Sequence, residues 1–488
     1  MSASTERKNR AAARAAGTDK KMLAAQEAEQ KARKTKRRWI IGTIAVILCI
    51  ALVLFLSSPL MYRVTTAVSV GSKNYSPAEL SYISSSAKSS LAGYGYDTLA
   101  AYFGQETADS LLNSAVNSSL IENAALLQYA KENNLSLTAF EKTQIADSTK
   151  RQMDYLKEAA KANGVSLSTY IGYVIGPGVN ERVLRSGMED SALTNKAYFS
   201  KFCSISFTPE ELAAYYEDPV DAELFSYVIY LVAADETRPA EEAQAAAEAV
   251  VTSFTDGWEE DVEPDVALTD ILAEEFPEAT PTVRSDVAGA DLDEAARAWL
   301  TEEGRAKGDI TSLEAPDGAG WYVVLFLDRK ADDEPVVAVR HILIKAEANE
   351  EGVYTDEAKA VALARAQEIL DAFNQTDKSE ASFASLAFLL SEDSGSSSSG
   401  GLYTTITKDQ TVPEFDAFCF DESRQYGDTA IVYGESAAYA GYHVMFFVEK
   451  LPAKDAAARD SLRSEAMSDW FNSLTEGLEP VSHWASKW

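Results

Sequence analysis

The sequence predicts an α+β protein with a single N-terminal transmembrane helix, a helical domain, two tandem βα domains and a C-terminal helix. Three observations support this prediction. Residues 39–62 contain no charged side chain. Residues 76–216 carry apolar side chains at the spacing of an α-helix. Residues 222–450 show the same order of strand and helix signals twice, with a period of roughly 110–120 residues.

Charge and cysteine content limit the possible classes of function. The 488 residues carry a net charge of −32, although residues 1–38 hold 12 Lys and Arg side chains against 4 acids. The remainder is strongly acidic, which disfavours nucleic-acid binding because phosphate contacts need Lys and Arg. The three cysteines and three histidines show no metal-ligand spacing and no disulfide framework. We therefore predict no metal, no cofactor and no nucleic-acid partner.

The N-terminal region is predicted to anchor the chain in a membrane. A helix of about 20 apolar residues spans a bilayer core, and residues 39–60 reach this length. The basic run KTKRR at residues 34–38 should stay in the cytoplasm by the positive-inside rule. Residues 1–38 are then a basic cytoplasmic segment, helical or disordered, and the bulk of this single-pass protein is extracytoplasmic. The alternative is a cleaved signal peptide, for which this basic leader is long.

Residues 70–218 are predicted to form a helical domain. Helix start signals occur at Ser76, Thr138 and Thr208. Amphipathic helices of this kind form either the ordinary core of a domain or a groove that cradles apolar peptide segments. The sequence alone leaves both interpretations open.

The two βα domains are predicted at residues 222–331 and 336–450. Each begins with an apolar strand, continues into an amphipathic helix and ends with a second apolar strand that follows a glycine. The predicted strands and helices are 222–233, 240–254 and 320–326 in the first domain, and 336–345, 357–373 and 441–447 in the second. An acidic, proline-bearing loop follows the first of these helices.

Residues 451–488 are predicted to form a C-terminal helix. Its apolar stripe consists of Leu462, Ala466, Met467, Trp470, Phe471 and Leu474. Exposure of such a stripe to water would be unfavourable, so we expect it to pack against another domain.

Four short motifs of the second βα domain occur in the order and spacing of a known family. They are VRHILI at 339–344, SEDS at 391–394, VPEFD at 412–416 and GYHV at 441–444. In these motifs the domain resembles the parvulin family of peptidyl-prolyl isomerases. The resemblance implies tandem parvulin-like domains, of which the first is degenerate. Matching strand to strand, His341 falls opposite Val228 of the first copy, and His443 falls opposite Tyr322.

The helical region resembles a second family more loosely. Residues 111–138 and 207–216 are similar to the helical chaperone domain of SurA- and PrsA-type foldases. This similarity implies a SurA-N-like chaperone domain that the C-terminal helix completes. It also implies that the protein comes from a bacterium with a single membrane, in which secreted chains fold between the membrane and the cell wall.

The parvulin resemblance assigns roles to six residues. It places His341, His443 and Asp393 in the catalytic centre, with the histidines paired and the carboxylate beside the substrate amide. It places Phe415, Tyr403 and Thr411 around the proline ring of the substrate. Without the family pattern, a histidine in an apolar strand is more often an ordinary core residue, and Phe415 would be assigned to the core.

Some residues depart from the family pattern. Tyr403 and Thr411 stand where the family commonly has Leu and Met, and the glycine-rich run reads GGLYT at 400–404. The Ser or Thr that the family carries shortly before the second histidine is absent. These departures concern the turnover rate and substrate preference more than the fold.

Two hypotheses about function follow. In the first, the chain is a membrane-anchored extracytoplasmic foldase that isomerises Xaa-Pro bonds in unfolded or secreted polypeptides, a reaction that needs no metal or cofactor. In the second, it is a non-enzymatic holdase or adaptor that uses parvulin-like folds to bind peptides. A hydrolase has little support, because the sequence shows no Gly-x-Ser-x-Gly, Cys/His or metal motif.

Overall fold

The computed structural model describes residues 3–18, 20–56, 60–91, 96–436 and 438–487. It divides into two compact units. The first comprises Met1–Ala125, Ile145–Glu189 and Gly477–Trp488, and the second comprises Leu126–Gln144 and Asp190–Glu476.

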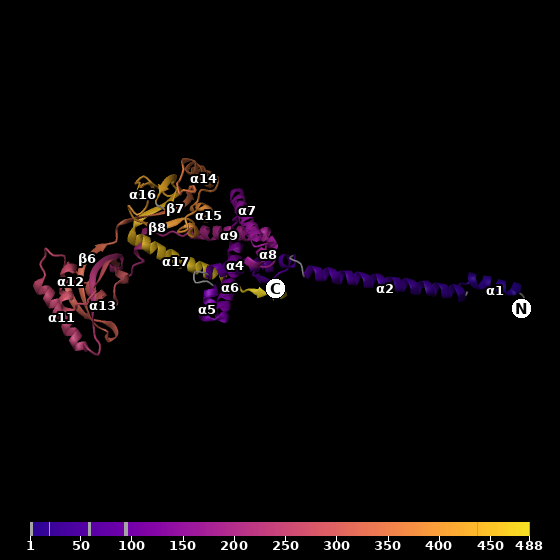
Figure 1. Ribbon diagram of the computed structural model, residues 1–488, viewed down its shortest axis with the longest axis horizontal. Helices are drawn as coiled ribbons and strands as arrows, with labels where there is room; N and C mark the ends of the chain where they lie inside the picture. Colours follow the sequence, from indigo (N-terminus) through magenta and orange to yellow (C-terminus); the bar gives the residue numbers. More distant parts are fainter. Residues whose placement is uncertain (1–2, 19, 57–59, 92–95, 437, 488) are drawn as a thin grey trace. The chain divides into compact units, whose positions relative to one another are not determined.

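The N-terminal region is helical. Helix α1 spans Ala3–Ala15, and helix α2 continues without a break over Lys20–Leu56 (Figure 1). Among the described residues, this region supplies one helix that is long and apolar enough to cross a membrane. Residues 57–59, at the end of the predicted span, lie outside the described residues.

The predicted helix start at Ser76 is present in the structure. Helix α4 (Pro77–Leu91) follows a capping box in which Ser76 and Glu79 satisfy each other's backbone N–H groups. The same arrangement of a hydroxyl and a glutamate precedes helices α7 and α10. The helices of this region are α3 (Met61–Val64), α4, α5 (Tyr96–Phe103), α6 (Gln105–Glu132), α7 (Ala139–Ala162), α8 (Leu167–Val174), α9 (Glu181–Phe202) and α10 (Pro209–Ala213).

A small antiparallel sheet, which the sequence did not indicate, closes the first unit. Its order is β11-β1-β2, formed by Val481–Ser482, Val68–Val70 and Lys73–Tyr75. The C-terminal strand therefore pairs with a strand more than 400 residues earlier in the chain. Leu478 packs in the same core as Tyr75 and Leu120, which ties the C-terminus to the helical domain.

Each of the tandem domains contains a four-stranded antiparallel sheet, and both sheets have the same topology. The first and last strands pair at the centre and the second and third lie at the edges, in the orders β4-β3-β6-β5 and β8-β7-β10-β9. The strands are β3 (Glu223–Ala233), β4 (Thr282–Ala288), β5 (Ile310–Glu314), β6 (Gly320–Ala331), β7 (Pro335–Lys345), β8 (Leu402–Ile406), β9 (Thr429–Glu435) and β10 (Ala440–Pro452).

Helices cover both faces of each sheet. In the first domain, α11 (Ala240–Gly257) and α12 (Pro264–Glu275) pack on one face and α13 (Glu294–Leu300) packs on the other. In the second domain, α14 (Asp356–Asn374) and α15 (Glu380–Leu390) pack on one face and α16 (Pro413–Cys419) on the other. Helix α12 corrects the prediction of a loop after α11, because Leu268 and Leu272 join the core. Short 3-10 turns lie at Pro219–Ala222, Gly289–Asp291, Pro316–Gly318, Ser397–Ser399 and Trp484–Lys487.

Helix α17 (Ala453–Thr475) corresponds to the predicted C-terminal helix and ends before strand β11. Its apolar stripe packs as expected. Met467 is buried, and the ring of Trp470 lies edge-on to Tyr129, with 5.2 Å between the ring centroids.

The two sheets can be aligned through one bulge in each central strand pair. In the first sheet the bulge follows the pair of Tyr227 and Phe326, and in the second it follows the pair of Val339 and Phe447. Phe326 and Phe447 also make equivalent backbone hydrogen bonds to the Gly-Asp dipeptide that precedes the third strand.

This register aligns His341 with Ile229 and His443 with Tyr322. The predicted match of His341 with Val228 is therefore wrong by one residue. Val228 points to the face that α11 and α12 cover, whereas His341 lies on the face of α16. The conclusion that the first copy has neither histidine is unchanged.

Candidate active site

The two histidines of the second βα domain meet on one face of the sheet. His341 on β7 is paired with Met445 on β10, and His443 is paired with Leu343, so the histidines are diagonal neighbours. Their rings are stacked at 5.2 Å between centroids and 23° between planes. The two Nδ1 atoms are 2.9 Å apart, and each residue is only 3% exposed. The expected convergence of the imidazoles is thus present in the structure.

Asp393 is held beside β7 by the residues that precede it. Ser391 Oγ accepts hydrogen bonds from the backbone N–H groups of Leu343 and Asp393, and Glu392 N–H donates to the carbonyl of Leu343. These contacts place Asp393 Oδ2 at 2.9 Å from His341 Nε2. Helix α15 ends at Leu390, directly before these residues.

With both imidazoles neutral, the network has one consistent set of hydrogen-bond directions. Ionised Asp393 can only accept, so His341 Nε2–H donates to it and His341 Nδ1 is left as an acceptor. His443 Nδ1–H then donates to His341, which leaves His443 Nε2 to accept the Tyr439 hydroxyl hydrogen at 2.9 Å. The chain of donors therefore runs from Tyr439 through both rings to the carboxylate.

Aromatic side chains enclose the histidine pair. Phe415, in the first turn of α16, lies edge-on to His341 at 5.4 Å and to His443 at 5.2 Å between ring centroids. It is 4% exposed and belongs to the core between α16 and the sheet. Tyr403 on β8 lies 5.3 Å from His341 and donates its hydroxyl hydrogen to Asp393 Oδ2 at 3.0 Å. Tyr403 is 39% exposed and forms a solvent-facing side of the site.

The structure thus brings together five of the six predicted site residues. The sixth, Thr411, precedes α16 and has a buried Oγ1 without a hydrogen-bond partner among the described residues. The described contacts of Thr411 do not include the histidines or Asp393. Its assignment to the substrate pocket stays a prediction.

Two residues of the network were not found from the sequence. Ser396 is fully buried; its hydroxyl donates to Asp393 Oδ2, and its oxygen lies 3.0 Å from His341 Nε2. Tyr439 supplies a hydroxyl to His443 from four residues before it. The family's Ser or Thr before the second histidine is absent from this sequence. Tyr439 could have been predicted as its replacement, because it carries a hydroxyl close to His443 in the sequence.

The surroundings shift the pKa values of the site residues in opposite directions. Burial, with a smaller effect of His341, lowers the pKa of His443 to about 3. Hydrogen bonds from His341 and from Ser396 outweigh partial burial and hold the pKa of Asp393 well below its usual value. Burial and the nearby Asp393 raise the pKa of Tyr403 to about 12. His443 therefore remains a neutral imidazole and Asp393 an anion at neutral pH.

The lowered pKa of His443 predicts an acid-dependent loss of stability. Below the ordinary value of 6.5 the unfolded chain takes up a proton at this histidine, whereas the folded chain does not until about pH 3. The free energy of unfolding should therefore fall by about 1.4 kcal/mol per pH unit as the pH drops below 6.5. Urea denaturation from pH 7 to pH 4.5 of the wild type and of His443→Gln measures this. A shallower slope for the variant is expected, and equal slopes would contradict the assignment.

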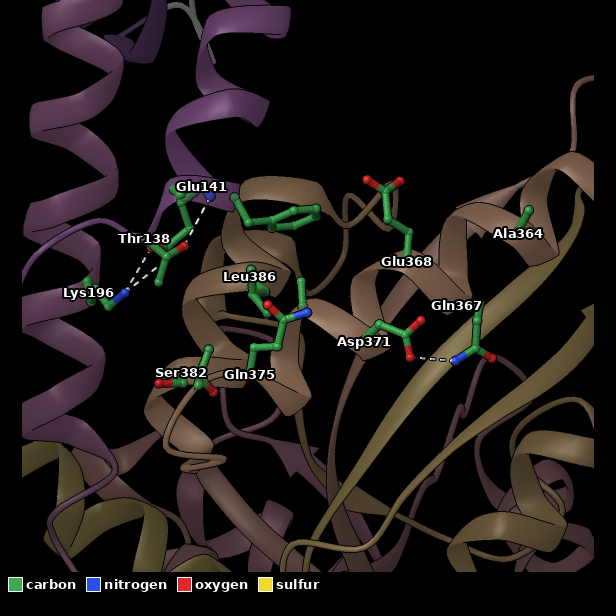
Figure 2. A pocket seen from close by; sticks show the side chains of 14 residues that line it. Thr138, Glu141, Lys196, Ala364, Gln367, Glu368, Asp371, Gln375, Ser382 and Leu386 are labelled. Carbon is green, nitrogen blue, oxygen red and sulfur yellow. Dashed lines mark hydrogen bonds and ion pairs between the residues drawn. The ribbon is translucent and has the colours of Figure 1, made fainter.

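A separate pocket lies between helices α14 and α15 of this domain and residues of the helical region (Figure 2). It has a volume of about 590 Å³ and is lined by residues of α14 and α15 and by the starting residues of α7. Lys196 and Glu141 form a buried ion pair in its wall, at 3.0 Å. This pocket does not include the histidines, because α14 and α15 cover the other face of the sheet. In the part of the chain that the structure describes, no group of three or more His, Cys, Asp or Glu side chains is arranged to hold a metal ion.

The first tandem copy lacks the corresponding chemistry. Ile229 and Tyr322 occupy the positions of the two histidines. Helices α13 and α16 have equal length, and the position of Phe415 in α16 corresponds to Ala296 in α13. The three equivalent side chains can form a core but cannot form the hydrogen-bond network.

Comparison with known proteins identifies the domain that carries the network. Residues 322–450 match the family model of the PPIC-type PPIase domain. The match begins within β6, ahead of the predicted boundary at residue 336. No curated protein matches the chain.

Several solved structures of foldases are similar to parts of the chain. The structure describing the SurA-like chaperones PEB4 and Cj1289 of Campylobacter jejuni is 19% identical, covers 29% of this chain and 51% of its own, and has a TM-score of 0.18. PrsA from Bacillus cereus is 14% identical, and the match covers 87% of this chain and 96% of the PrsA chain, with a TM-score of 0.18. Foldase PrsA from Lactococcus lactis is 11% identical, and the match covers 68% of this chain and 97% of the PrsA chain, with a TM-score of 0.21.

This chain spans about half the length of the first of these three structures. The family match and the paired histidines on neighbouring strands agree with each other. The chain therefore carries a parvulin-type peptidyl-prolyl isomerase domain, of the PPIC type, at residues 322–450.

Proposed function

We propose that this protein is a membrane-anchored, extracytoplasmic foldase that catalyses cis–trans isomerisation of Xaa-Pro bonds in unfolded or secreted polypeptides. The observation that supports it most is the continuous network from Tyr439 through His443 and His341 to Asp393. A buried imidazole pair fixed by an anion is a preorganised polar site. The apolar part of helix α2 and the basic run that precedes it within the same helix support the anchored topology.

The chemistry of proline isomerisation suits such a site. Rotation about the peptide bond crosses a barrier of about 18–20 kcal/mol, and no bond is broken. In the transition state the amide is twisted and its C–N bond has lost double-bond character. An enzyme accelerates the rotation by binding this twisted form more tightly than either planar form. The ring of Phe415 offers an apolar contact for that purpose, and the imidazoles offer fixed dipoles.

The roles of the site residues follow from their hydrogen bonds. Asp393 Oδ2 already accepts from His341, Ser396 and Tyr403, so we assign it to fixing the imidazole tautomers and the local field. His341 and His443 would face the substrate amide. Phe415 and Tyr403 would border the proline ring, with Tyr403 on the solvent side.

The experiment compares turnover of the full chain, in detergent micelles, on an Xaa-Pro peptide in a protease-coupled assay. We expect His443→Ala to lower kcat/KM about 100-fold, because it removes one member of the network. His483→Ala is the matched control, since it removes the third histidine of the chain, which contacts Ser69 in the first unit. Equal rates for the wild type and His443→Ala would remove the enzymatic claim.

A holdase or adaptor is the second candidate, and the first tandem copy favours it. With Ile229, Tyr322 and Ala296 in place of the site residues, that copy keeps the fold without the network. A holdase would suppress aggregation of an unfolded client to the same extent in the wild type and in His443→Ala, with no acceleration of proline isomerisation in either.

The Tyr439 hydroxyl provides a milder test of the network. Tyr439→Phe removes the hydrogen bond to His443 Nε2 but keeps the ring, which lies 5.7 Å from His443. We expect kcat to fall about 5-fold, in the range of one lost hydrogen bond, with no change in the thermal unfolding midpoint beyond a few degrees. Tyr433→Phe, on the neighbouring strand with its hydroxyl on Glu435, is the control. An unchanged kcat for Tyr439→Phe would exclude this hydrogen bond from the mechanism.

A further inference from the structure

The residue before the first histidine is a fully buried arginine. The Arg340 side chain has no exposed surface, and its Nε donates to Glu380 at 2.8 Å. It lies on the opposite face of β7 from His341, since successive strand residues alternate. A buried guanidinium needs hydrogen-bond partners for its donors. The remaining contacts of Arg340 therefore show which segments it connects.

Two of those contacts go to the loop that carries Ser396. Arg340 Nη1 donates to the carbonyls of Ser399 and Gly400, at 2.8 and 2.9 Å. The same loop is tied to β7 from its other side, because His341 N–H donates to the carbonyl of Gly401, and Gly401 N–H donates to the carbonyl of Ser396. The position of the Ser396 hydroxyl, beside Asp393 and His341, therefore depends on where Arg340 holds the loop.

The remaining contacts of Arg340 go to the end of helix α9. Its guanidinium carbon lies 5.7 Å from the ring centroids of both Phe199 and Phe202, and Nη2 lies 3.5 Å from Cys203 Sγ. Cation–π contacts of this kind gain strength when they are shielded from water, as they are here. We refer to Phe199, Phe202 and Cys203 as the α9 clamp.

The α9 clamp also touches the loop backbone directly. Gly400 has a positive φ of +68°, and a Cβ built there would lie 2.9 Å from both Phe199 Cζ and Arg340 Nη1. Only a glycine fits between these groups. Phe199 itself is 1% exposed, and its ring also packs edge-on against Phe388 of α15.

We propose that the α9 clamp, acting through Arg340, positions the loop at residues 393–401, so that a helix outside the isomerase domain controls the geometry of its active site. Arg340, Phe199 and Phe202 are then positioning residues, and none of them contacts the substrate. Loss of the clamp leaves Arg340 without its aromatic partners and lets the loop move relative to His341. The effect on turnover rests on the proposed isomerase function, whereas the effect on the histidines does not.

The first experiment measures kcat and KM of full-length Phe199→Leu on an Xaa-Pro peptide. We expect kcat to fall about tenfold, in the range of a misplaced catalytic group, while KM changes less than twofold. KM should change little because Phe415, which we place beside the proline ring of the substrate, lies on α16 and is not among the groups that the α9 clamp contacts. In a Ser396→Ala background, Phe199→Leu should lower kcat by less than in the wild type, because one of the two groups that the loop positions is already gone. An unchanged kcat, or the same loss in both backgrounds, would overturn the proposal.

Leu184→Ala is the matched control for stability. Leu184 lies on the same helix and is fully buried, but it packs in the core of the first unit. We expect its unfolding midpoint to fall at least as far as that of Phe199→Leu, with kcat unchanged. If Leu184→Ala lowers kcat equally, general destabilisation explains both variants and the proposal fails. Arg340→Lys keeps the charge but cannot bridge two carbonyls and stack on two rings, so it should reproduce the loss seen with Phe199→Leu.

The second experiment uses the imidazole nitrogen resonances of the three histidines. In Phe199→Leu the His341 and His443 signals should shift, and the His483 signal should stay in place. This result is independent of turnover. If the wild type has no isomerase activity but the histidine signals shift in Phe199→Leu, the proposed function is wrong and the role of the α9 clamp stands. If the His341 and His443 signals do not shift in Phe199→Leu, the role of the α9 clamp is wrong.

Discussion

Asp393→Ala is expected to reduce kcat/KM on an Xaa-Pro peptide about 100-fold, which is the size of effect seen when a preorganised electrostatic group is removed. The carboxylate is the end point of the hydrogen-bond chain, and its Oδ2 accepts from His341, Ser396 and Tyr403. Without it, the tautomers of both imidazoles are no longer fixed. Steady-state kinetics at pH 7 measure this loss.

The control for this substitution is Asp421→Ala. Asp421 also accepts hydrogen bonds from its own turn, at Ser423, and its pKa is also lowered, first by those hydrogen bonds. It lies in an exposed turn between α16 and β9 and does not contact the histidines. A loss for Asp421→Ala equal to that for Asp393→Ala would mean that the domain is sensitive to any such aspartate, and the role given to Asp393 would be wrong.

Phe415→Ala is expected to have the largest combined effect on stability and binding. The ring is buried between α16 and the sheet, so its removal should lower the free energy of unfolding by about 3–5 kcal/mol. Because the ring also borders both histidines, we expect KM to rise about tenfold, roughly 1.4 kcal/mol of lost binding. Denaturant melts and steady-state kinetics measure the two effects separately.

Phe418→Ala separates core packing from substrate contact. Phe418 lies one turn later in α16, is equally buried and belongs to the same core, but its ring faces Arg424. We expect the same loss of stability and no change in KM, measured at a temperature where both variants remain folded. A KM that rises equally in both variants would show that Phe415 acts only as a core residue.

The paired histidines could be predicted because the motifs VRHILI and GYHV around them resemble those of the parvulin family. The capped helix starts at Ser76, Thr138 and Thr208 could be predicted because hydroxyl and glutamate sit three residues apart. Asp393 and Phe415 followed from short motifs around them. In each case the information lies within a few residues of the predicted feature.

The features that sequence reasoning missed depend on contacts between distant segments. Ser396 lies in a run of Gly and Ser that suggests a flexible loop. Arg340, more than 50 residues earlier, donates to the carbonyls of Ser399 and Gly400 in the same loop. The small sheet has strands of two or three residues, which are too short to show a pattern. The match of His341 with Val228 failed because the register of the first strands is set by their pairing with β6 and β10, which are far away in the sequence.

The most direct test of the isomerase assignment is NMR exchange spectroscopy on a proline-containing peptide with a catalytic amount of the full-length protein. This measurement needs no coupling enzyme, and it reads cis–trans exchange of the peptide itself. We predict exchange on the second-or-faster timescale, against tens of seconds or more without enzyme, and its loss in Asp393→Ala. Exchange at the uncatalysed rate with the folded wild-type protein would contradict the account.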